Sequence, residues 1–270
     1  MFKHRNKIEY GGISPFHINV SYVELHRDDP ENQFDSHVHP ECEIYVNFSG
    51  DVSFMVEDRI YPILPGSVII TRPYEYHHCV YHSNEPHRHL WILISSDGNE
   101  HLLTRFFERR RGESNHLCLS ADSLKEFLDL SMEILEKKLS DAELYYRFFG
   151  LLRLLLEADE YKGEGDDEIG AILSYIDSHI SQPLTVADLA EAAHVSINTL
   201  ERHFVKNLGM TPSTYLRKKR LAVAAKRLYE GASVTDACRD SGFSDDSHFI
   251  SLFRHYYGVT PNRYKKKNAP

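Results

Sequence analysis

The pattern of apolar and polar positions changes its period once along the chain. Up to about residue 118, short runs of β-branched and aromatic residues are separated by Gly, Pro, Asn and Asp. Such runs are typical of short strands, in which alternate side chains point to opposite faces of a sheet. The clearest runs predict strands at 41–48, 52–56, 66–71 and 90–95. Many short strands at this spacing predict a jelly roll or a small barrel.

From residue 120 to 161, apolar residues recur with the 3.6-residue period of a helix. Two helices are expected, one striped by Leu124, Phe127, Leu128 and Leu135, and the next by Leu144, Phe148, Leu151, Leu152 and Leu155. The second helix carries a further stripe of Tyr145, Phe149 and Leu156. One apolar stripe of this helix can pack against the sheet, and the additional stripe must be covered by another surface. That surface is either a second copy of the chain or another part of the same monomer.

An acidic stretch follows the two helices. Residues 157–168 contain two glycines and no apolar stripe, which is the composition of a linker. We place the linker at 162–168. It separates a strand-rich domain (1–118) and a helical segment (119–161) from a C-terminal domain (169–268).

The C-terminal domain contains the same pattern twice. Phe204 and Phe253 are 49 residues apart, and so are the prolines of two Gly-x-Thr-Pro sequences, Pro212 and Pro261. A repeat of this length usually means that one supersecondary unit is used twice. Each copy predicts a short helix, a tight turn and a second helix. Ser196 suits the N-cap of the second helix in the first copy, and Ser244 or Asp245 suits it in the second. This is a helix-turn-helix, whose second helix fits the major groove of DNA.

A basic stretch at 212–229 joins the two copies. Pro212 suits the first turn of a helix and Gly231 suits its C-terminal end. At 1.5 Å per residue, this helix is about 25 Å long. It can hold two recognition helices about one turn of DNA apart, roughly 34 Å.

The stretch from about residue 169 to 264 resembles the DNA-binding domain of AraC-type bacterial transcription regulators. The resemblance implies three partners: double-stranded DNA, a small-molecule effector and a second copy of the chain, bound through helices such as those at 119–161. RNA polymerase is a further partner of such regulators. The residues that carry the resemblance are Leu189, Ala190, Ser196, Leu200, Phe204, Gly209, Met210, Thr211, Pro212, Tyr215, Arg220, Ala224, Leu228, Gly242, Phe243, Ser244, Asp245, Phe249, Phe253, Gly258, Val259, Thr260 and Pro261.

The net charge of −9 seems wrong for a DNA-binding protein until it is divided between the domains. Residues from Ile169 onward carry +5 and the preceding residues carry −14. This asymmetry is expected of an acidic sensor joined to a basic DNA-binding domain. The sequence has no secretory start and no apolar run of membrane-spanning length, so we expect a cytoplasmic protein without a membrane partner. The four cysteines show no paired spacing, which favours reduced thiols.

The strand-rich domain contains two segments that resemble the motifs of the cupin family. The first runs from His37 through His39 and Glu43 to Gly50, and the second from Pro65 through Pro73 to His77 and His78. The resemblance implies that His37, His39, Glu43 and His77 are metal ligands. His37, His39 and Glu43 share parity, so on one strand they point to one face. Two imidazoles and a carboxylate, completed by His77 or His78, suit a divalent metal such as Zn, Fe, Mn or Ni.

The alternative is that these histidines line a polar effector pocket and no metal is required. We interpret His82, His87 and His89 as loop and strand-edge residues and not as further metal ligands. An effector pocket needs apolar walls and a few polar groups. Tyr45 and Asn47 share the parity of Glu43, and Trp91, the single tryptophan, lies on a late strand. Aromatic faces beside carboxylate and amide groups suit a sugar or a related polyhydroxylated compound. The alternative for Tyr45 and Trp91 is an ordinary place in the core.

The positions expected to face DNA bases come from the motif. In the first copy they are Asn198, Glu201 and Arg202, which can pair with adenine, cytosine and guanine respectively. In the second copy they are Asp246, Ser247 and Ser251, a set that departs from the family pattern of an amide and an arginine. We therefore expect the first copy to carry most of the sequence discrimination. The expected phosphate contacts are Lys206, Arg254, Lys265, Lys266 and Lys267.

The predicted fold is therefore α+β, with a cupin-like domain, a helical hairpin and two helix-turn-helix units joined by a long helix. The leading functional hypothesis is a DNA-binding transcription regulator that acts as a homodimer and is not an enzyme. The first alternative is a metal-dependent cupin enzyme or metal sensor fused to a DNA-binding domain. The second is a constitutive DNA-binding protein whose barrel binds nothing.

Overall fold

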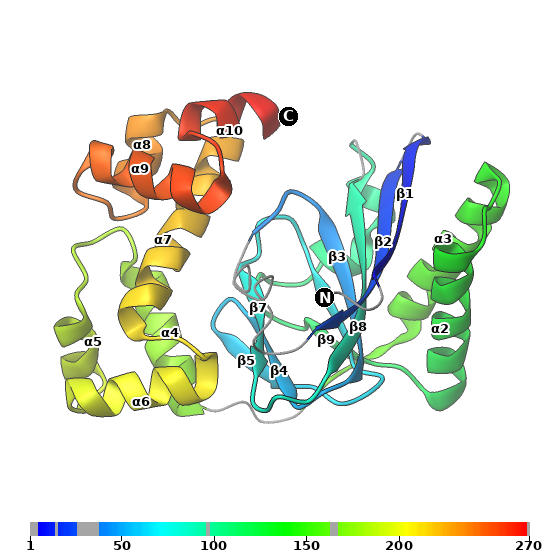
Figure 1. Ribbon diagram of the computed structural model, residues 1–270, viewed down its shortest axis with the longest axis horizontal. Coiled ribbons are helices and arrows are strands. Elements are labelled where there is room, and N and C mark those ends of the chain that lie inside the picture. Colours follow the sequence, from blue (N-terminus) through cyan, green and yellow to red (C-terminus); the bar gives the residue numbers. More distant parts are fainter. Residues whose placement is uncertain (1–4, 14–15, 26–37, 96–97, 163–166, 269–270) are drawn as a thin grey trace. The chain divides into compact units, whose positions relative to one another are not determined.

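The computed structural model describes residues 5–13, 16–25, 38–95, 98–162 and 167–268, and the chain forms two compact units that meet in sequence at residues 165 and 166. The first unit is built from two sheets (Figure 1). One has seven strands in the order β1-β2-β8-β3-β6-β9-β10, and the other has the order β5-β4-β7. The strands are β1 (Arg5–Ile13), β2 (Phe16–Leu25), β3 (Cys42–Ser49), β4 (Val52–Val56), β5 (Arg59–Pro62), β6 (Val68–Thr71), β7 (His77–Tyr81), β8 (His87–Ser95), β9 (His116–Cys118) and β10 (Asp159–Glu160).

The expected strand at 52–56 is confirmed, and the other three are confirmed with shifted ends. The strand expected at 66–71 begins only at Val68, because Gly66 lies in a turn with φ +91°. The strand expected at 90–95 begins three residues earlier, at His87. That shift adds His87 and His89 to a central strand of the larger sheet, paired on one side with β2 and on the other with β3.

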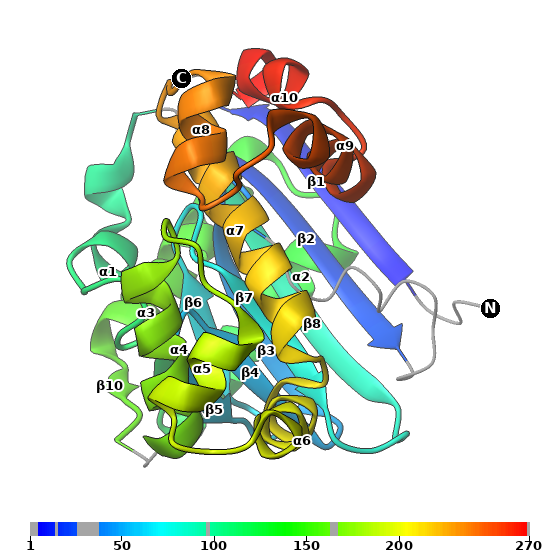
Figure 2. The ribbon, with the colours of Figure 1, turned by 90° about the vertical axis from the view of Figure 1, so that its left-hand side faces the viewer.

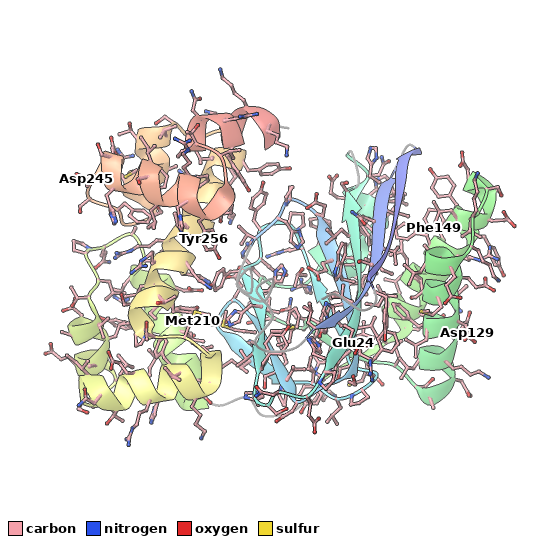
Figure 3. The ribbon with its side chains drawn as sticks, in the orientation of Figure 1. Glu24, Asp129, Phe149, Met210, Asp245 and Tyr256 are labelled. Atoms are coloured by element: carbon pink, nitrogen blue, oxygen red, sulfur yellow. The ribbon has the colours of Figure 1, made fainter. Side chains whose placement is uncertain are left out.

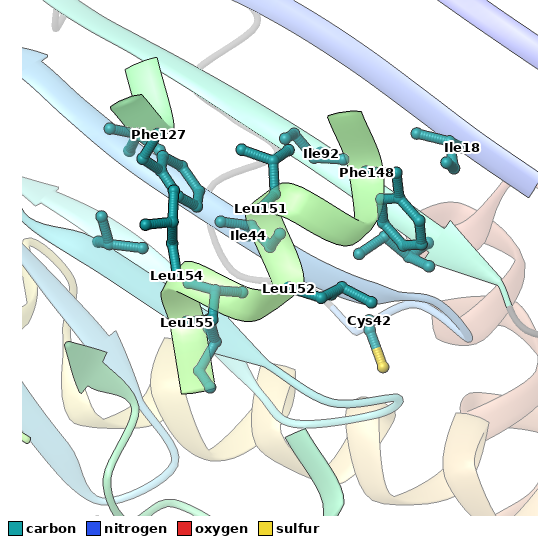
Figure 4. Packing of buried hydrophobic residues seen from close by; sticks show 14 of the residues in the cluster. Ile18, Cys42, Ile44, Ile92, Phe127, Phe148, Leu151, Leu152, Leu154 and Leu155 are labelled. Atoms are coloured by element: carbon teal, nitrogen blue, oxygen red, sulfur yellow. The ribbon is translucent and has the colours of Figure 1, made fainter. Parts of the chain in front are cut away.

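Two helices, α2 (Ala121–Glu136) and α3 (Asp141–Glu157), cover one face of the larger sheet (Figure 1). Ile44 and Ile92 point from the sheet into this layer and pack with Phe148 and Leu151 of α3 (Figure 4). The predicted helical stripes are thereby confirmed. A short 3-10 turn (Glu100–Leu102) and α1 (Thr104–Phe107) precede β9 and were not expected from the sequence.

The opposite face of the larger sheet forms a second layer with the smaller sheet. Tyr45 of β3 and Ile69 of β6 belong to one apolar cluster with Phe54 and Val56 of β4. Because strand side chains alternate, Glu43, Tyr45 and Asn47 share this inner face while Ile44 and Val46 face the helices. The inner layer is therefore where polar side chains of β3 are enclosed.

The linker after α3 is shorter than the acidic stretch that predicted it. Asp159 and Glu160 form β10, which pairs with β9 and so belongs to the first unit. The expected linker at 162–168 lies largely outside the described residues, and Asp167 already begins α4 (Asp167–His179).

The second unit is all helical, and both predicted helix-turn-helix units are present. The first copy consists of α5 (Val186–Ala192) and α6 (Ile197–Leu208), and the second of α8 (Val234–Asp240) and α9 (Asp246–Tyr257). Ser196 caps α6, and Asp245, labelled in Figure 3, caps α9 by accepting a hydrogen bond from the backbone N–H of His248 at 2.6 Å. The joining helix α7 (Pro212–Tyr229) has the predicted bounds, and α10 (Pro261–Asn268) follows α9.

Helix α7 separates the two copies along its length, with α6 near one end and α8 near the other (Figure 2). Among the described residues no helix is both long and apolar enough to cross a membrane. The four cysteines, all within the described ranges, are free thiols.

Candidate functional site

The first candidate site lies in the inner layer of the first unit, where two histidines meet one carboxylate. The Nε2 atoms of His39 and His77 lie 2.9 and 3.0 Å from Oε2 of Glu43. Candidate ligand atoms of the three residues all lie within 4.8 Å of one another. His37, the fourth residue implied by the cupin resemblance, lies outside the described residues. The cluster therefore unites three of the four expected ligands.

The route by which His39 reaches Glu43 differs from the expected one. His39 precedes β3 and is not on a strand, so the shared parity with Glu43 does not explain their contact. Its backbone carbonyl accepts a hydrogen bond from the N–H of Tyr74 at 2.9 Å, which fixes this segment beside the β6–β7 connection. Of the neighbouring histidines His77 and His78, His77 is the one that joins the cluster. Successive strand residues face opposite sides, and His77 is the one that contacts Glu43.

A buried network fixes the orientation of His77. Its Nδ1 lies 2.7 Å from the backbone carbonyl of Glu75, which leaves Nε2 facing Glu43. The fully buried side chain of Glu75 accepts hydrogen bonds from the guanidinium of Arg109, from the N–H of Gly112 at 2.8 Å and from the N–H of Arg72 at 2.9 Å. A metal-binding histidine commonly donates its second nitrogen to such an acceptor, which sets the tautomer.

The charges of the cluster support one another. Burial opposes ionisation of Glu43, but the hydrogen bond from His39 and the close approach of the His77 ring hold its pKa well below the ordinary value. Burial likewise opposes protonation of His39, but hydrogen bonds to Glu41 and Glu43 raise its pKa to about 9. A carboxylate that stays ionised in a buried place, with two imidazole nitrogens on it, is a donor set that fits a divalent cation, which would displace the proton on His39.

A second group of polar side chains lines the same inner layer, one register step further along β3. Tyr45 Oη lies 2.5 Å from Nε2 of His87, whose Nδ1 lies 3.2 Å from Tyr81 Oη. His89 stacks on Tyr45 and on His87, with ring centroids 5.1 and 4.6 Å apart. The interpretation of His87 and His89 as loop or strand-edge residues was wrong, because β8 begins earlier than expected and is paired on both sides.

These histidines are enclosed as neutral groups. Desolvation by burial lowers the pKa of His87 to about 2 and that of His89 to about 4. Asn47 pairs with His89 across the two strands and is completely buried. Within the described residues, neither amide atom of Asn47 nor Nδ1 of His89 has a hydrogen-bond partner. We call the inner-face surface formed by Asn47 and His89 the wall. Unsatisfied buried polar atoms cost free energy, so the three such atoms of the wall indicate a place for a polar ligand or water.

The other expected effector residues lie on the same wall. Trp91 pairs with Tyr45 in the register of β8 and β3, and its side chain is half-buried. Glu43 pairs with Leu93 on these two strands. Parity with Trp91 puts His87 and His89 on the inner face once β8 is known to begin at His87.

The candidate nucleic-acid interface lies on the second unit. On α6, Asn198, Glu201, Arg202 and Lys206 are exposed, while Leu200 and Phe204 are buried. On α9, Asp246, Ser247, Ser251 and Arg254 are exposed, while Phe249 and Phe253 are buried. Each helix thus buries one stripe in its own unit and presents the predicted DNA-facing residues to solvent.

The basic residues of α7 lie in two kinds of environment. Arg220 donates hydrogen bonds to the backbone carbonyls of Gln182 and Leu184, at 3.0 and 3.3 Å, and so fixes the connection between α4 and α5. Arg217 is exposed. The residue that holds the α4–α5 connection in place therefore belongs to the joining helix and not to either recognition helix.

A further exposed surface lies on α3 of the first unit. Tyr146, Phe149 (labelled in Figure 3) and Leu156 are 77%, 42% and 56% exposed. Phe149 and Leu156 belong to the surplus stripe predicted from the sequence. The core of the monomer leaves this stripe largely uncovered.

The first unit encloses polar side chains in its inner layer. The second unit contains two helix-turn-helix copies, each of which presents an exposed recognition helix. This combination is typical of a ligand-binding, DNA-binding protein. Comparison with known proteins agrees with this class in both halves. The family model of the AraC-like ligand binding domain matches residues 20–160, and that of a helix-turn-helix domain matches residues 189–267. The chain belongs to the AraC family of DNA-binding transcription regulators.

Individual relatives align over most of the chain or over less than half of it. The HTH-type transcriptional activator RhaS of Klebsiella pneumoniae (strain 342) is 25% identical over 269 residues, which cover 91% of this chain and 92% of that protein. The activator RhaS of Escherichia coli (strain SE11) is 32% identical over 117 residues, 42% of each chain. Among solved structures, the C-terminal domain of the two-component response regulator yesN from Fusobacterium nucleatum is 27% identical. It covers 37% of this chain and 99% of that one, with a TM-score of 0.36.

Proposed function

We propose that this protein regulates transcription in response to a small, uncharged, polyhydroxylated molecule bound in the inner layer of its first unit. The observation that carries the proposal is the wall formed by Asn47 and His89, whose buried polar atoms have no partner among the described residues. An amide offers both a donor and an acceptor, and the histidines on this wall are neutral. A hydroxylated ring could satisfy these groups and pack beside the half-buried ring of Trp91.

The wall argues against an anionic effector. Among the described residues, the histidines next to Asn47 supply no positive charge at neutral pH, because burial lowers the pKa values of His87 and His89. The carboxylate of Glu43 could accept hydrogen bonds from hydroxyl groups. We therefore place sugars and related polyols first among candidate effectors.

A second candidate effector is a divalent metal ion. The cluster of His39, Glu43 and His77 supports it, since the three residues offer two imidazoles and one ionised carboxylate within 4.8 Å. Zn, Ni, Fe and Mn all accept this donor set. In this role the metal would be sensed by the regulator or would help to hold the organic effector.

We further propose that the protein acts as a homodimer through α3. The exposed stripe of Tyr146, Phe149 and Leu156 supports this proposal, because large apolar side chains grouped on one helix favour an interface. Dimerisation would place four recognition helices on one operator, and an effector that binds one arrangement better shifts the population towards it.

Selection of bound duplexes from a random DNA library by the full-length protein tests the proposal. The selection is repeated in the presence of pools of neutral sugars and polyols, of organic acids, and of divalent metals. We expect one enriched sequence, whose affinity changes with a neutral polyol and not with an acid. An absence of any enriched sequence would overturn the regulator, and a response only to acids would overturn the effector class.

The variant Asn47→Leu provides the matching test of the wall. Replacing an unsatisfied buried amide by an apolar side chain of similar size should not destabilise the fold. We expect this variant to bind the enriched DNA as tightly as the parent and to lose the response to the effector. Ser53→Ala is the control, since Ser53 bonds His82 on the exposed side of β4.

A further inference from the structure

The exposed apolar side chains of the second unit gather on its two recognition helices. Among the described residues from 167 to 268, the large apolar side chains that are exposed are Ile197 and Val205 on α6 and Ile250 on α9, at 45%, 52% and 37%. The other described helices of this unit expose none. Neither α6 nor α9 needs these residues for its packing, because each buries its own stripe through Phe204 or Phe249 and Phe253.

The repeat places these residues among the predicted base-facing positions. With the spacing of 49 residues, Ile250 is the counterpart of Glu201, and Arg254 is the counterpart of Val205. Residues three and four apart are neighbours on a helix surface. Ile250 therefore lies between Ser247 and Arg254, and the three residues share one shallow hollow.

At these two matching positions, the order of the apolar and the charged side chain is therefore reversed between the two copies. The first copy has the carboxylate of Glu201 followed one turn later by the isopropyl group of Val205. The second has the apolar Ile250 followed one turn later by the guanidinium of Arg254. Since the matching positions carry opposite chemistry, the two helices cannot prefer the same base sequence.

The confinement of these exposed β-branched side chains to the two recognition helices favours a role in binding. Valine and isoleucine are weaker helix formers than alanine, and leaving them in water gains nothing. In the major groove the apolar group available to a recognition helix is the 5-methyl group of thymine. We propose that Ile250 and Val205 each contact a thymine methyl group, so that the second copy also discriminates bases. The proposal rests on the DNA-binding role of α6 and α9 and adds Ile250 to the residues expected from the motif.

The test removes one methyl group from the DNA and leaves the protein unchanged. In the duplex selected by the full-length protein, each thymine is replaced in turn by deoxyuridine, and affinities are measured at fixed salt. We expect at least one replacement to weaken binding about fourfold, which corresponds to one buried methylene-sized group. If the sensitive thymine lies under α9, its replacement should not change the affinity of the Ile250→Ala variant. If the thymine lies under α6, its replacement should not change the affinity of the Val205→Ala variant.

The salt dependence separates a base contact from a phosphate contact. Ile250→Ala should weaken binding without changing the slope of log K against log salt, whereas Arg254→Ala should reduce that slope by about one unit if Arg254 binds a phosphate. Ile250→Val, which keeps a branched apolar side chain, should retain most of the affinity.

The outcomes distinguish this proposal from the function on which it rests. If a duplex is selected but no deoxyuridine replacement weakens binding, the methyl contacts are wrong and the regulator stands. If Ile250→Ala changes the oligomeric state and not the affinity for DNA, the exposed side chains bind protein and the proposal is overturned. If no duplex is selected, the proposed function itself fails.

Discussion

A methyl group placed on Gly242 would stand 2.1 Å from the backbone carbonyl oxygen of Ile180. It would also stand 2.9 Å from Nε of Arg220, the residue of α7 that braces the carbonyls of Gln182 and Leu184. The turn of the second helix-turn-helix therefore packs directly on the backbone that leads into the first. The relative placement of the two recognition helices depends on this contact as well as on α7.

Gly242→Ala should destabilise the second unit and weaken DNA binding. Gly242 has φ +79°, where a Cβ costs about 1–2 kcal/mol, and the backbone of Ile180 cannot easily move away. Gly258→Ala is the matched control, because its φ is +72° but no atom lies within 4 Å of the added carbon. In urea unfolding we expect Gly242→Ala to lose at least about 1 kcal/mol more than the control. Equal losses would contradict the contact.

Arg202→Ala should cost about 1–3 kcal/mol of binding to the selected duplex and relax one base position. Arg202 is exposed on α6, so the free energy of unfolding should not change. Ser251→Ala removes the matching residue of α9 and should cost less, because a serine hydroxyl makes one weaker contact than a bidentate guanidinium. Affinity measurements on duplexes with single base changes decide the ranking, and a larger loss for Ser251→Ala would reverse it.

Metal binding should distinguish two neighbouring buried histidines. His77 contacts Glu43, whereas His78 has the opposite parity on β7. If the cluster holds a divalent metal, elemental analysis and Zn²⁺ titration should show about one equivalent for the parent and for His78→Ala, and a loss of tenfold or more in affinity for His77→Ala and Glu43→Gln. Equal binding by His77→Ala and the parent would reject the site.

Acidification should weaken the first unit before most carboxylates titrate. Burial lowers the pKa of His89 to about 4 from an ordinary value of 6.5. Below pH 6.5 the unfolded chain therefore takes up a proton that the folded chain refuses, and this contribution to stability is lost as the pH falls towards 4. The free energy of unfolding should fall by up to about 1.4 kcal/mol per pH unit for each such histidine. The fluorescence of Trp91, the single tryptophan, reports on this unit. His89→Phe should reduce the slope between pH 6.5 and 5 by about one proton, and an unchanged slope would contradict the assignment.

Leu156→Glu should convert a dimer into a monomer without unfolding the chain. Leu156 is 56% exposed on α3, so the monomer tolerates a charge there, while a buried unpaired carboxylate in an interface costs several kcal/mol. Sedimentation should show dimer dissociation at least about tenfold easier than for the parent. Leu64→Glu, at a leucine 73% exposed outside α2 and α3, is the control. If both variants sediment like the parent, α3 is not the interface.

The local elements of the second unit could be predicted from the amino-acid sequence. Spacing of 49 residues between Phe204 and Phe253 identified two copies of one unit, and side-chain caps at Ser196 and Asp245 set where α6 and α9 begin. Helix α7 likewise follows from Pro212 at its start and a stop before Gly231. These features are predictable because period, caps and stops act between residues a few positions apart.

Only the tertiary structure decided which of the seventeen histidines meet. His39 contacts Glu43 from outside the strand, and His77 arrives from the other sheet. His87 and His89 join the wall because β8 starts three residues before its apolar run and pairs with β3 in a register that sets Asn47 opposite His89. Pairing between strands forty residues apart depends on register and packing across the whole unit, and no local pattern in the chain specifies it.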